Sequence, residues 1–329
     1  MKAVDANRIF SISSDEEFNA MALQVFQYQY QNNTIYRNYV KALSLDISGI
    51  ESYEQIPFLP IEFFKNQEIV CGEKDENTFV FTSSSTTSQT PSKHFVKDIT
   101  LYEKSFLEGF KKFYDQPNTL VILALLPNYL ERTGSSLVYM FDKLIQLTNN
   151  KQSGFFLNNY DELKIRIEEL RSSGQKTLLL GVSYALLDLA EMNVKLNDDF
   201  MVMETGGMKG KRKELLKEEL HKILKDKFGV KQIHSEYGMT ELLSQAYSKG
   251  NGIFECPPWM RIIIRDIDDP LSITKSNSTG GINVIDLANL NSCSFIATQD
   301  LGRRKDNGSF ELMGRYDASD VRGCNLMIG

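Results

Sequence analysis

Apolar and polar residues follow one another along this chain in patterns that predict defined secondary structure elements. Near the N-terminus, apolar residues such as Phe18, Met21 and Val25 recur at helical spacing, which predicts a helix over residues 16–30. Further along, short apolar runs predict buried strands at 78–81, 120–125, 154–157, 177–180, 200–203 and 232–234. The amphipathic stretches between them predict helices at 135–147, 160–171 and 211–227.

Strands that alternate with helices favour an α/β fold, with mostly parallel sheets covered by helices. The pattern changes after Gly250, where strands at 259–266, 281–286, 294–298 and 309–312 follow one another without long helices. We therefore expect two domains: an α/β core over 1–250, and a smaller β-rich part with a C-terminal tail over 251–329. The apolar segment 57–65 contains two prolines and is expected to be a packed loop.

Composition narrows the class of protein. The 329 residues carry 37 basic and 43 acidic side chains, a net charge of −6, which argues against a nucleic-acid-binding protein. No apolar run is long enough for a membrane span or typical of a signal peptide, so we expect a cytoplasmic protein. The four cysteines lie far apart without a Cys-x-x-Cys pair, and there are three histidines, which disfavours a zinc site or a disulfide framework.

A run of hydroxyl residues follows the predicted strand at 78–81. It contains Ser83, Ser84, Ser85, Thr86, Thr87 and Ser88. Hydroxyl groups and backbone N–H groups can surround a triphosphate, and Lys93 adds a positive charge nearby. The alternative is a Ser/Thr-rich surface loop without a ligand.

Glycines mark a second candidate segment, at the end of the strand predicted over 200–203. Gly206 and Gly207 allow the backbone to approach a flat ligand closely. Three basic residues follow at 211–213, where they oppose the positive end of the predicted helix and would suit a nearby anion. The alternative is a glycine turn before a basic helix start.

Two further segments carry candidate ligand groups. In 237–241, Tyr237 can stack on a base and Glu241 can hold Mg²⁺, although Thr240 and Glu241 also fit a helix cap followed by a first-turn acid. Asp300 can accept hydrogen bonds from both ribose hydroxyls, and Arg315 can reach the ribose or the α-phosphate. The alternative for these two residues is a pair of turns with solvated charges.

Taken together, these segments resemble the adenylate-forming superfamily of acyl- and aryl-CoA ligases, from about Phe81 onward. Residues 83–93 stand where that family has its phosphate loop, and 237–241 match Tyr-Gly-x-Thr-Glu at every fixed position, including Gly238 and Thr240. Residues 298–302 match Thr-Gly-Asp-Leu/Arg-Gly with glutamine at the second position, and 314–317 match the Gly-Arg-x-Asp hinge.

Other segments make the chain most similar to the acyl-protein synthetase branch, the synthetase of the luciferase-associated fatty-acid reductase complex and its relatives. They are 59–65, 91–94, 204–207 and 320–324. The resemblance implies that ATP and Mg²⁺ activate a carboxylic acid, in this branch a fatty acid, as an acyl-adenylate. It also implies that a cysteine near the C-terminus, here Cys324, receives the acyl group for a reductase or an acyl carrier protein.

The resemblance implies a role for each candidate residue. The phosphate loop and Lys93 would hold the β- and γ-phosphates, and Glu241 would hold Mg²⁺. Gly206, Gly207 and Tyr237 would flank the adenine. Asp300 and Arg315 would fix the ribose.

Two other functions remain open, a ligase that transfers the acyl group to CoA or to a carrier, and an inactive relative that only binds nucleotide or a partner. Ser85 and Ser88 stand where the family has glycine, which weakens the match if those positions need positive φ. The family's separate C-terminal domain, with its catalytic lysine, is not expected because the chain ends at Gly329. The aromatic motif of the ligases is recognisable only loosely at 127–129.

Overall fold

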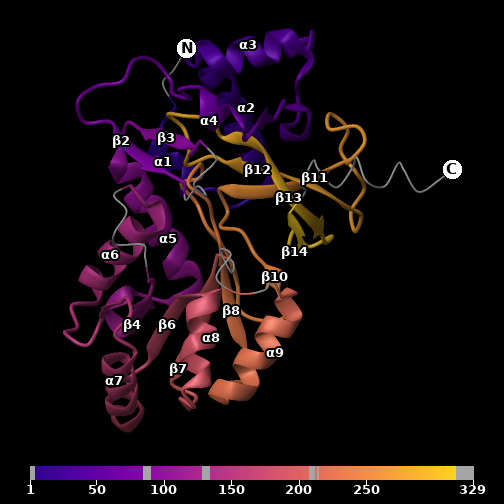
Figure 1. Cartoon of the computed structure of the whole chain (residues 1–329). Coiled ribbons are helices and arrows are strands. Elements are labelled where there is room, and N and C mark those ends of the chain that lie inside the picture. Colours follow the sequence, from indigo (N-terminus) through magenta and orange to yellow (C-terminus); the bar gives the residue numbers. More distant parts are fainter. Residues whose placement is uncertain (1–3, 84–89, 128–133, 207–211, 213–214, 316–329) are drawn as a thin grey trace, which may run out of the picture. The chain divides into compact units, whose positions relative to one another are not determined.

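The apolar runs of the middle part form a six-stranded sheet with the order β5-β4-β6-β7-β8-β9 (Figure 1). The structure, a computed structural model, describes residues 4–83, 90–127, 134–206, 212 and 215–315. The strands are β4 (Val121–Leu125), β5 (Gly154–Phe156), β6 (Thr177–Val182), β7 (Phe200–Thr205), β8 (Ile233–Tyr237) and β9 (Ala246–Ser248). The first five strands pair in parallel, and β9 runs antiparallel to β8.

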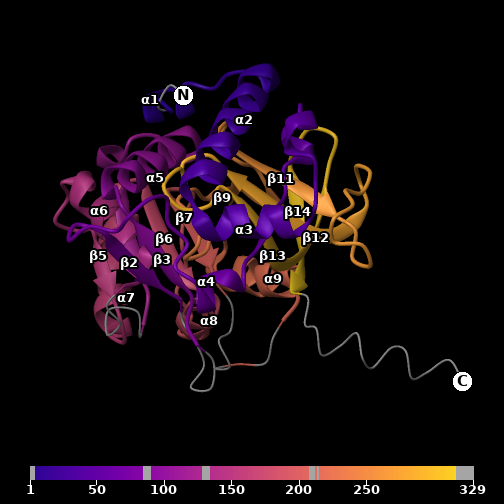
Figure 2. The same cartoon turned by 90° about the horizontal axis from the view of Figure 1, so that it is seen from above.

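Helices cover both faces of this sheet. They are α5 (Ile99–Tyr114), α6 (Ser136–Thr148), α7 (Tyr160–Ser173), α8 (Ser183–Glu191) and α9 (Lys217–Phe228). Figure 2 shows α7, α8 and α9 on one side of the sheet and α5 and α6 on the other. Every residue of β4 and β6 is buried, as expected for strands covered on both faces. The α/β fold predicted from the sequence is therefore confirmed.

Two helices differ from the prediction. The helix predicted over 211–227 begins only at Lys217, and the side chain of Leu216 is 73% exposed, so the apolar pattern was extended too far. Helix α8 was not predicted, because seven of its nine residues are buried and only Asp188 and Glu191, near its C-terminal end, interrupt the apolar run.

A second sheet contains four antiparallel strands in the order β14-β13-β12-β11. They are β11 (Met260–Arg265), β12 (Thr279–Asp286), β13 (Phe295–Arg304) and β14 (Phe310–Arg315), which confirms the β-rich part expected after Gly250. The segment expected as a packed loop adds a short strand, β1 (Leu59–Pro60), which pairs in parallel with β13 and is followed by α4 (Phe63–Asn66).

The N-terminal residues form helices around this second sheet. Helix α2 (Asp15–Asn32) confirms the helix predicted over 16–30, and it buries Phe18, Met21 and Val25. The remaining elements are α1 (Ala6–Ile9), α3 (Thr34–Ala42), the 3₁₀ turns η1 (Ile47–Gly49), η2 (Tyr53–Gln55) and η3 (Pro117–Thr119), the hairpin strands β2 (Phe79–Thr82) and β3 (Lys93–Val96), and β10 (Ile253–Phe254). No helix in the described part of the chain is long and apolar enough to cross a membrane.

Contacts divide the chain into two compact units. Unit 1 contains the residues up to Tyr102, Glu241–Ser244, and the residues from Glu255 onward; unit 2 contains Glu103–Thr240 and Gln245–Phe254. This grouping differs from the division at Gly250 expected from the sequence. Helix α2 explains why: the buried Gln29 side chain donates hydrogen bonds to the carbonyls of Asn289 and Leu290, which ties the N-terminal part to the C-terminal sheet.

Candidate active site

The β2–β3 hairpin holds the two ends of the candidate phosphate loop together in unit 1. The backbone N–H of Ser83 donates to the carbonyl of Ser92 at 3.1 Å, and the N–H of Ser92 donates to the Ser83 hydroxyl at 2.8 Å. Lys93 follows on β3 with an exposed side chain, opposite Thr82. The predicted residues Ser84, Ser85, Thr86, Thr87 and Ser88 lie outside the described residues.

Glu241 belongs to the same unit and contacts the loop end of this hairpin, at Ser92. Its side chain is 5% exposed, and its carboxylate accepts a hydrogen bond from the Ser92 hydroxyl. Burial raises the pKa of Glu241, while this hydrogen bond and the Arg315 charge oppose the rise. No helix begins at Thr240, so the helix-cap alternative for these residues is wrong.

Asp300 and Arg315 lie directly opposite each other on the neighbouring strands β13 and β14. The Arg315 Nε is 3.6 Å from Asp300 Oδ1, with the arginine exposed and the aspartate mostly buried. The alternative reading of two turns is therefore wrong. The Arg315 charge lowers the pKa of Glu241 and the Asp300 charge raises it, so the pair lies within electrostatic range of Glu241 in unit 1.

One departure from the family pattern has a structural explanation. Gln299 stands where the adenylate-forming ligases have glycine, and its amide donates to the Glu62 carboxylate at 2.6 Å. The bond links β13 to the residue before α4, so a side chain at this position strengthens unit 1.

The remaining described candidates lie in unit 2, at the carboxyl ends of parallel strands, which is the edge where α/β sheets bind ligands. Gly206 has φ +67°, and its carbonyl accepts a hydrogen bond from Ser183 at 3.2 Å. Tyr237 is buried against the edge of the Phe254 ring. At Gly238 a Cβ would lie 2.5 Å from Glu236 Oε1, so a side chain at this position would displace the Glu236 carboxyl group. Gly207 lies outside the described residues.

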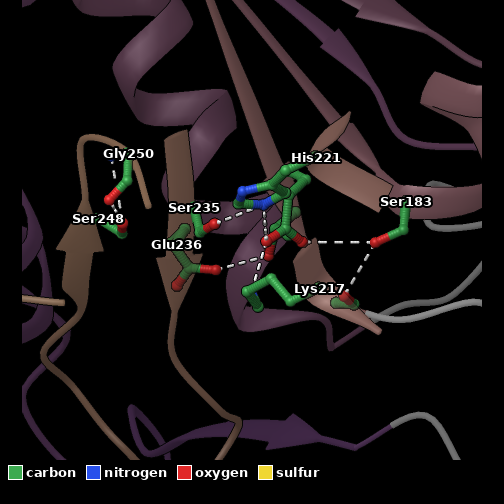
Figure 3. Close-up of polar contacts among 10 residues, drawn as sticks. Ser183, Lys217, His221, Ser235, Glu236, Ser248 and Gly250 are labelled. Carbon is green, nitrogen blue, oxygen red and sulfur yellow. Dashed lines mark hydrogen bonds and ion pairs between the residues drawn. The ribbon is translucent and has the colours of Figure 1, made fainter. Parts of the chain in front are cut away.

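A buried polar cluster that the sequence did not predict lies next to Gly206 (Figure 3). The Glu204 carboxylate, at the end of β7, is contacted by Lys217 Nζ at 2.5 Å and by His221 Nε2 at 3.4 Å, both from α9. The Ser183 hydroxyl donates to its other oxygen at 3.4 Å. Burial alone would raise the pKa of Glu204, but Lys217 and the hydrogen bonds lower it to about 2. The available signal was an acidic residue directly after the apolar run 200–203.

A second carboxyl group nearby has the opposite character. Burial raises the pKa of Glu236 to about 7, and the hydroxyl of Thr205 donates to it at 2.5 Å. Glu204 and Glu236 thus occupy neighbouring strands with pKa values displaced in opposite directions.

Within the basic run 211–213, the described residue Arg212 does not need a bound anion to balance its charge. Arg212 pairs with the carboxylates of Asp188 and Glu191 on α8, so that part of the expectation is wrong. Lys211 and Lys213 lie outside the described residues.

The donor set in unit 1 fits Mg²⁺ better than a transition metal. Among the residues that the structure describes, no group of three or more His, Cys, Asp or Glu side chains could hold a metal ion. Glu241 offers one carboxylate beside the hydroxyl of Ser92. Mg²⁺ is commonly held by one or two carboxylates together with substrate phosphates, so this arrangement suits a metal that arrives with a nucleotide.

Comparison with known proteins supports the same class of fold. No family model matches the chain. The long-chain-fatty-acid–luciferin-component ligase of Vibrio harveyi is 22% identical over 92% of this chain and 85% of its own length. Among solved structures, ATP-bound MatB from Rhodopseudomonas palustris matches 72% of this chain with a TM-score of 0.54 and 16% identity. An open conformation of 2-hydroxyisobutyryl-CoA ligase, in complex with 2-HIB-AMP and CoA, matches 96% of this chain with a TM-score of 0.66 and 13% identity. The chain spans about half the length (47%) of the MatB structures that it matches.

Proposed function

We propose that this chain, which has the fold of the adenylate-forming ligases and resembles a fatty-acid ligase in sequence, uses ATP to convert a carboxylic acid into an acyl-adenylate. The observation that carries the proposal is the meeting of three distant segments in unit 1. The base of the hydroxyl-rich loop, Glu241, and the Asp300–Arg315 pair come from residues 83–93, 241 and 300–315, and they lie together as a nucleotide site requires.

In the proposed reaction, a carboxylate oxygen of the substrate attacks the α-phosphorus of ATP. The bond to the bridging oxygen breaks and pyrophosphate leaves, so the products are acyl-adenylate and pyrophosphate. Catalysis of this step depends on positioning and charge neutralisation. Loop 83–88 and Lys93 hold the outer phosphates, and Asp300 with Arg315 orients the ribose. When bound on Glu241, Mg²⁺ offsets negative charge on the phosphates.

Two assignments remain predictions. Gly206, Gly207 and Tyr237 are expected to flank the adenine, and Gly238 and Thr240 are expected to act in the same motif as Tyr237. The phosphate, metal and ribose assignments are also proposals. What supports them is that the hairpin hydroxyl of Ser92, Glu241 and the Asp300–Arg315 pair contact or electrostatically influence one another within one unit. The acid itself is proposed to be a fatty acid, by similarity to the Vibrio harveyi ligase.

The acyl group is proposed to pass to a thiol, with Cys324 as the first candidate. The thiolate would attack the mixed anhydride, release AMP and form a thioester that a reductase or carrier protein can take up. Desolvation raises the pKa of both Cys256 and Cys293 to about 12, and burial also raises the pKa of Cys71, which disfavours the reactive thiolate at these three positions. Cys324 lies outside the described residues. Transfer to CoA or to a carrier phosphopantetheine is the alternative.

Replacement of the metal-binding carboxylate tests the proposal. Glu241→Gln should lower acid-dependent ATP–pyrophosphate exchange by about a hundredfold or more, because a charge partner of the transition state is lost. Glu68→Gln is the matched control: its carboxylate is also in unit 1 but is 61% exposed, and its partner is Lys74. Exchange at the wild-type rate in folded Glu241→Gln protein would exclude Glu241 as the metal ligand.

A further inference from the structure

A short piece of chain, Glu241–Ser244, is grouped with unit 1 although the residues before and after it belong to unit 2. Asp286, at the end of β12, holds this piece. Its carboxylate accepts hydrogen bonds from the backbone N–H groups of Leu243 and Ser244 at 2.7 and 2.9 Å, and from the Ser244 hydroxyl at 2.5 Å. Asp286 is fully buried, so these donors compensate for its lost hydration.

Asn289 binds the first residue of the same piece. Its carboxamide donates to the carbonyl of Glu241 and to the carbonyl of Cys293, both at 2.8 Å. Its oxygen lies 2.9 Å from Nε2 of His94. Because both carbonyls only accept hydrogen bonds, the amide nitrogen must face them, and His94 must then carry its proton on Nε2. Every hydrogen-bonding direction of this buried amide is therefore determined.

His94 connects this network to the candidate phosphate loop. It lies on β3, two residues after Ser92, and is fully buried with its ring packed edge-on against Phe64. Glu241 is consequently held twice: its carboxylate by the Ser92 hydroxyl, and its backbone carbonyl by Asn289, which His94 orients. Both connections lead to the same hairpin strand, so the position of the carboxylate relative to the loop base is fixed by hydrogen bonds rather than by packing alone.

We infer that Asn289 and His94 are positioning residues, which hold Glu241 at the base of loop 83–92 so that a cation bound to a nucleotide meets a prepared carboxylate. Asp286 anchors Leu243 and Ser244 of the same piece by accepting their hydrogen bonds. The inference rests on the proposed function. It adds Asn289, which lies in none of the motifs of the sequence, and it gives a role to His94, which lies in segment 91–94 but had none. A preorganised ligand avoids the cost of ordering a side chain when the metal–nucleotide complex binds.

Asn289→Asp tests the inference, because it keeps the shape of the side chain and the acceptor for His94 but loses both donors. We expect the dissociation constant of Mg²⁺ from the ATP-bound protein, measured by calorimetry, and the Mg²⁺ concentration that gives half-maximal exchange both to rise about tenfold, by the loss of a buried hydrogen bond. The KM of the acid should stay unchanged. Asn291→Asp is the matched control: its side chain contacts Tyr28 and not Glu241, and we expect wild-type behaviour. An unchanged Mg²⁺ dependence in folded Asn289→Asp protein, or the same shift in both variants, would overturn the inference.

His94 provides a second test that does not depend on the stability of the Asn289 variant. In His94→Gln the amide nitrogen can replace Nε2 as donor, so the Mg²⁺ dependence should stay within about twofold of wild type, whereas His94→Leu should shift it as Asn289→Asp does. Equal Mg²⁺ dependence in these two His94 variants would contradict the inference. Glu241→Gln, measured in parallel, separates the two claims. If Glu241→Gln retains full exchange, the proposed metal site fails. If Glu241→Gln loses exchange but the positioning variants keep the Mg²⁺ dependence of wild type, only the inference fails.

Discussion

The ion pair between Lys217 and Glu204 allows the sharpest stability prediction. The carboxylate of Glu204 is 2% exposed, whereas the Lys217 side chain is 28% exposed and reaches it from α9 at 2.5 Å. The ammonium group also lies 5.1 Å from the centre of the Phe254 ring. Lys217→Met keeps an unbranched apolar stem in this position but removes the charge, so the buried carboxylate loses its main partner.

The expected cost follows from what remains around Glu204. Removal of one partner of a buried ion pair typically costs about 3–5 kcal/mol. We expect the lower end, about 3 kcal/mol, because the His221 ring remains 3.4 Å from the carboxylate and the Ser183 hydroxyl still donates a hydrogen bond to it. Glu204→Gln in the Lys217→Met background removes the unpaired charge, so the double variant should recover more than half of the loss.

Urea unfolding at pH 7, followed by circular dichroism, measures this series. Lys231→Met is the control, since Lys231 and its partner Asp198 are both 82% exposed and such pairs contribute less than about 1 kcal/mol. The lowered pKa of Glu204 also makes the free energy of unfolding depend on pH. The stabilisation by the ionised Glu204 is complete above about pH 4.5 and disappears as the pH falls toward 2. The free energies of unfolding of wild type and Lys217→Met should therefore converge near pH 2. The reasoning would be refuted if the free energy of unfolding of Lys217→Met were within about 1 kcal/mol of wild type. It would also be refuted if the double variant were less stable than Lys217→Met.

Three further predictions concern Glu236, Asp300 and Cys324. Because the pKa of Glu236 is raised from 4.5 to about 7 in the folded state, the stability of wild type should decrease as the pH rises through this range. Thermal melts of Glu236→Gln should lack that decrease, and parallel stability–pH profiles of the two proteins would contradict the prediction. Asp300→Ala should weaken ATP binding about tenfold without affecting acid binding, and unchanged affinity in calorimetry would exclude the ribose assignment. Cys324→Ser should still form acyl-adenylate but lose hydroxylamine-labile labelling by radioactive acid; full labelling of the variant, or label on another cysteine, would exclude Cys324.

The sequence predicted the strands well because buried strands are continuous apolar runs, which need no knowledge of their partners. The strands β4 and β6 were recognised in this way. Helix α8 was not, because the burial of seven of its nine residues leaves too little of the periodicity that identifies a helix. Segment 57–65 was identified as packed, but its pairing with β13 depends on residues more than 200 positions away.

The candidate site was predictable only where its residues lie in short motifs. Glu241 and Asp300 each belong to such a motif, whereas Asn289 lies in none and reaches Glu241 only after folding. His94 lies in segment 91–94, but its hydrogen bond to Asn289 could not be read from that segment. Glu204 was visible within a motif, but its partner Lys217 was hidden in a helix of alternating charge. Arg212 was misread because the carboxylates that neutralise it come from another helix.

Acid-dependent exchange of labelled pyrophosphate into ATP tests the central claim most directly. The purified chain is incubated with ATP, Mg²⁺, labelled pyrophosphate and one member of a panel of fatty and aromatic acids. If the chain forms an acyl-adenylate, labelled ATP should accumulate with at least one acid and not without acid, since reversal of adenylation is the only route for the label. If folded protein binds ATP but produces no exchange with any acid of the panel, the chain is a nucleotide-binding relative and not an acyl-activating enzyme.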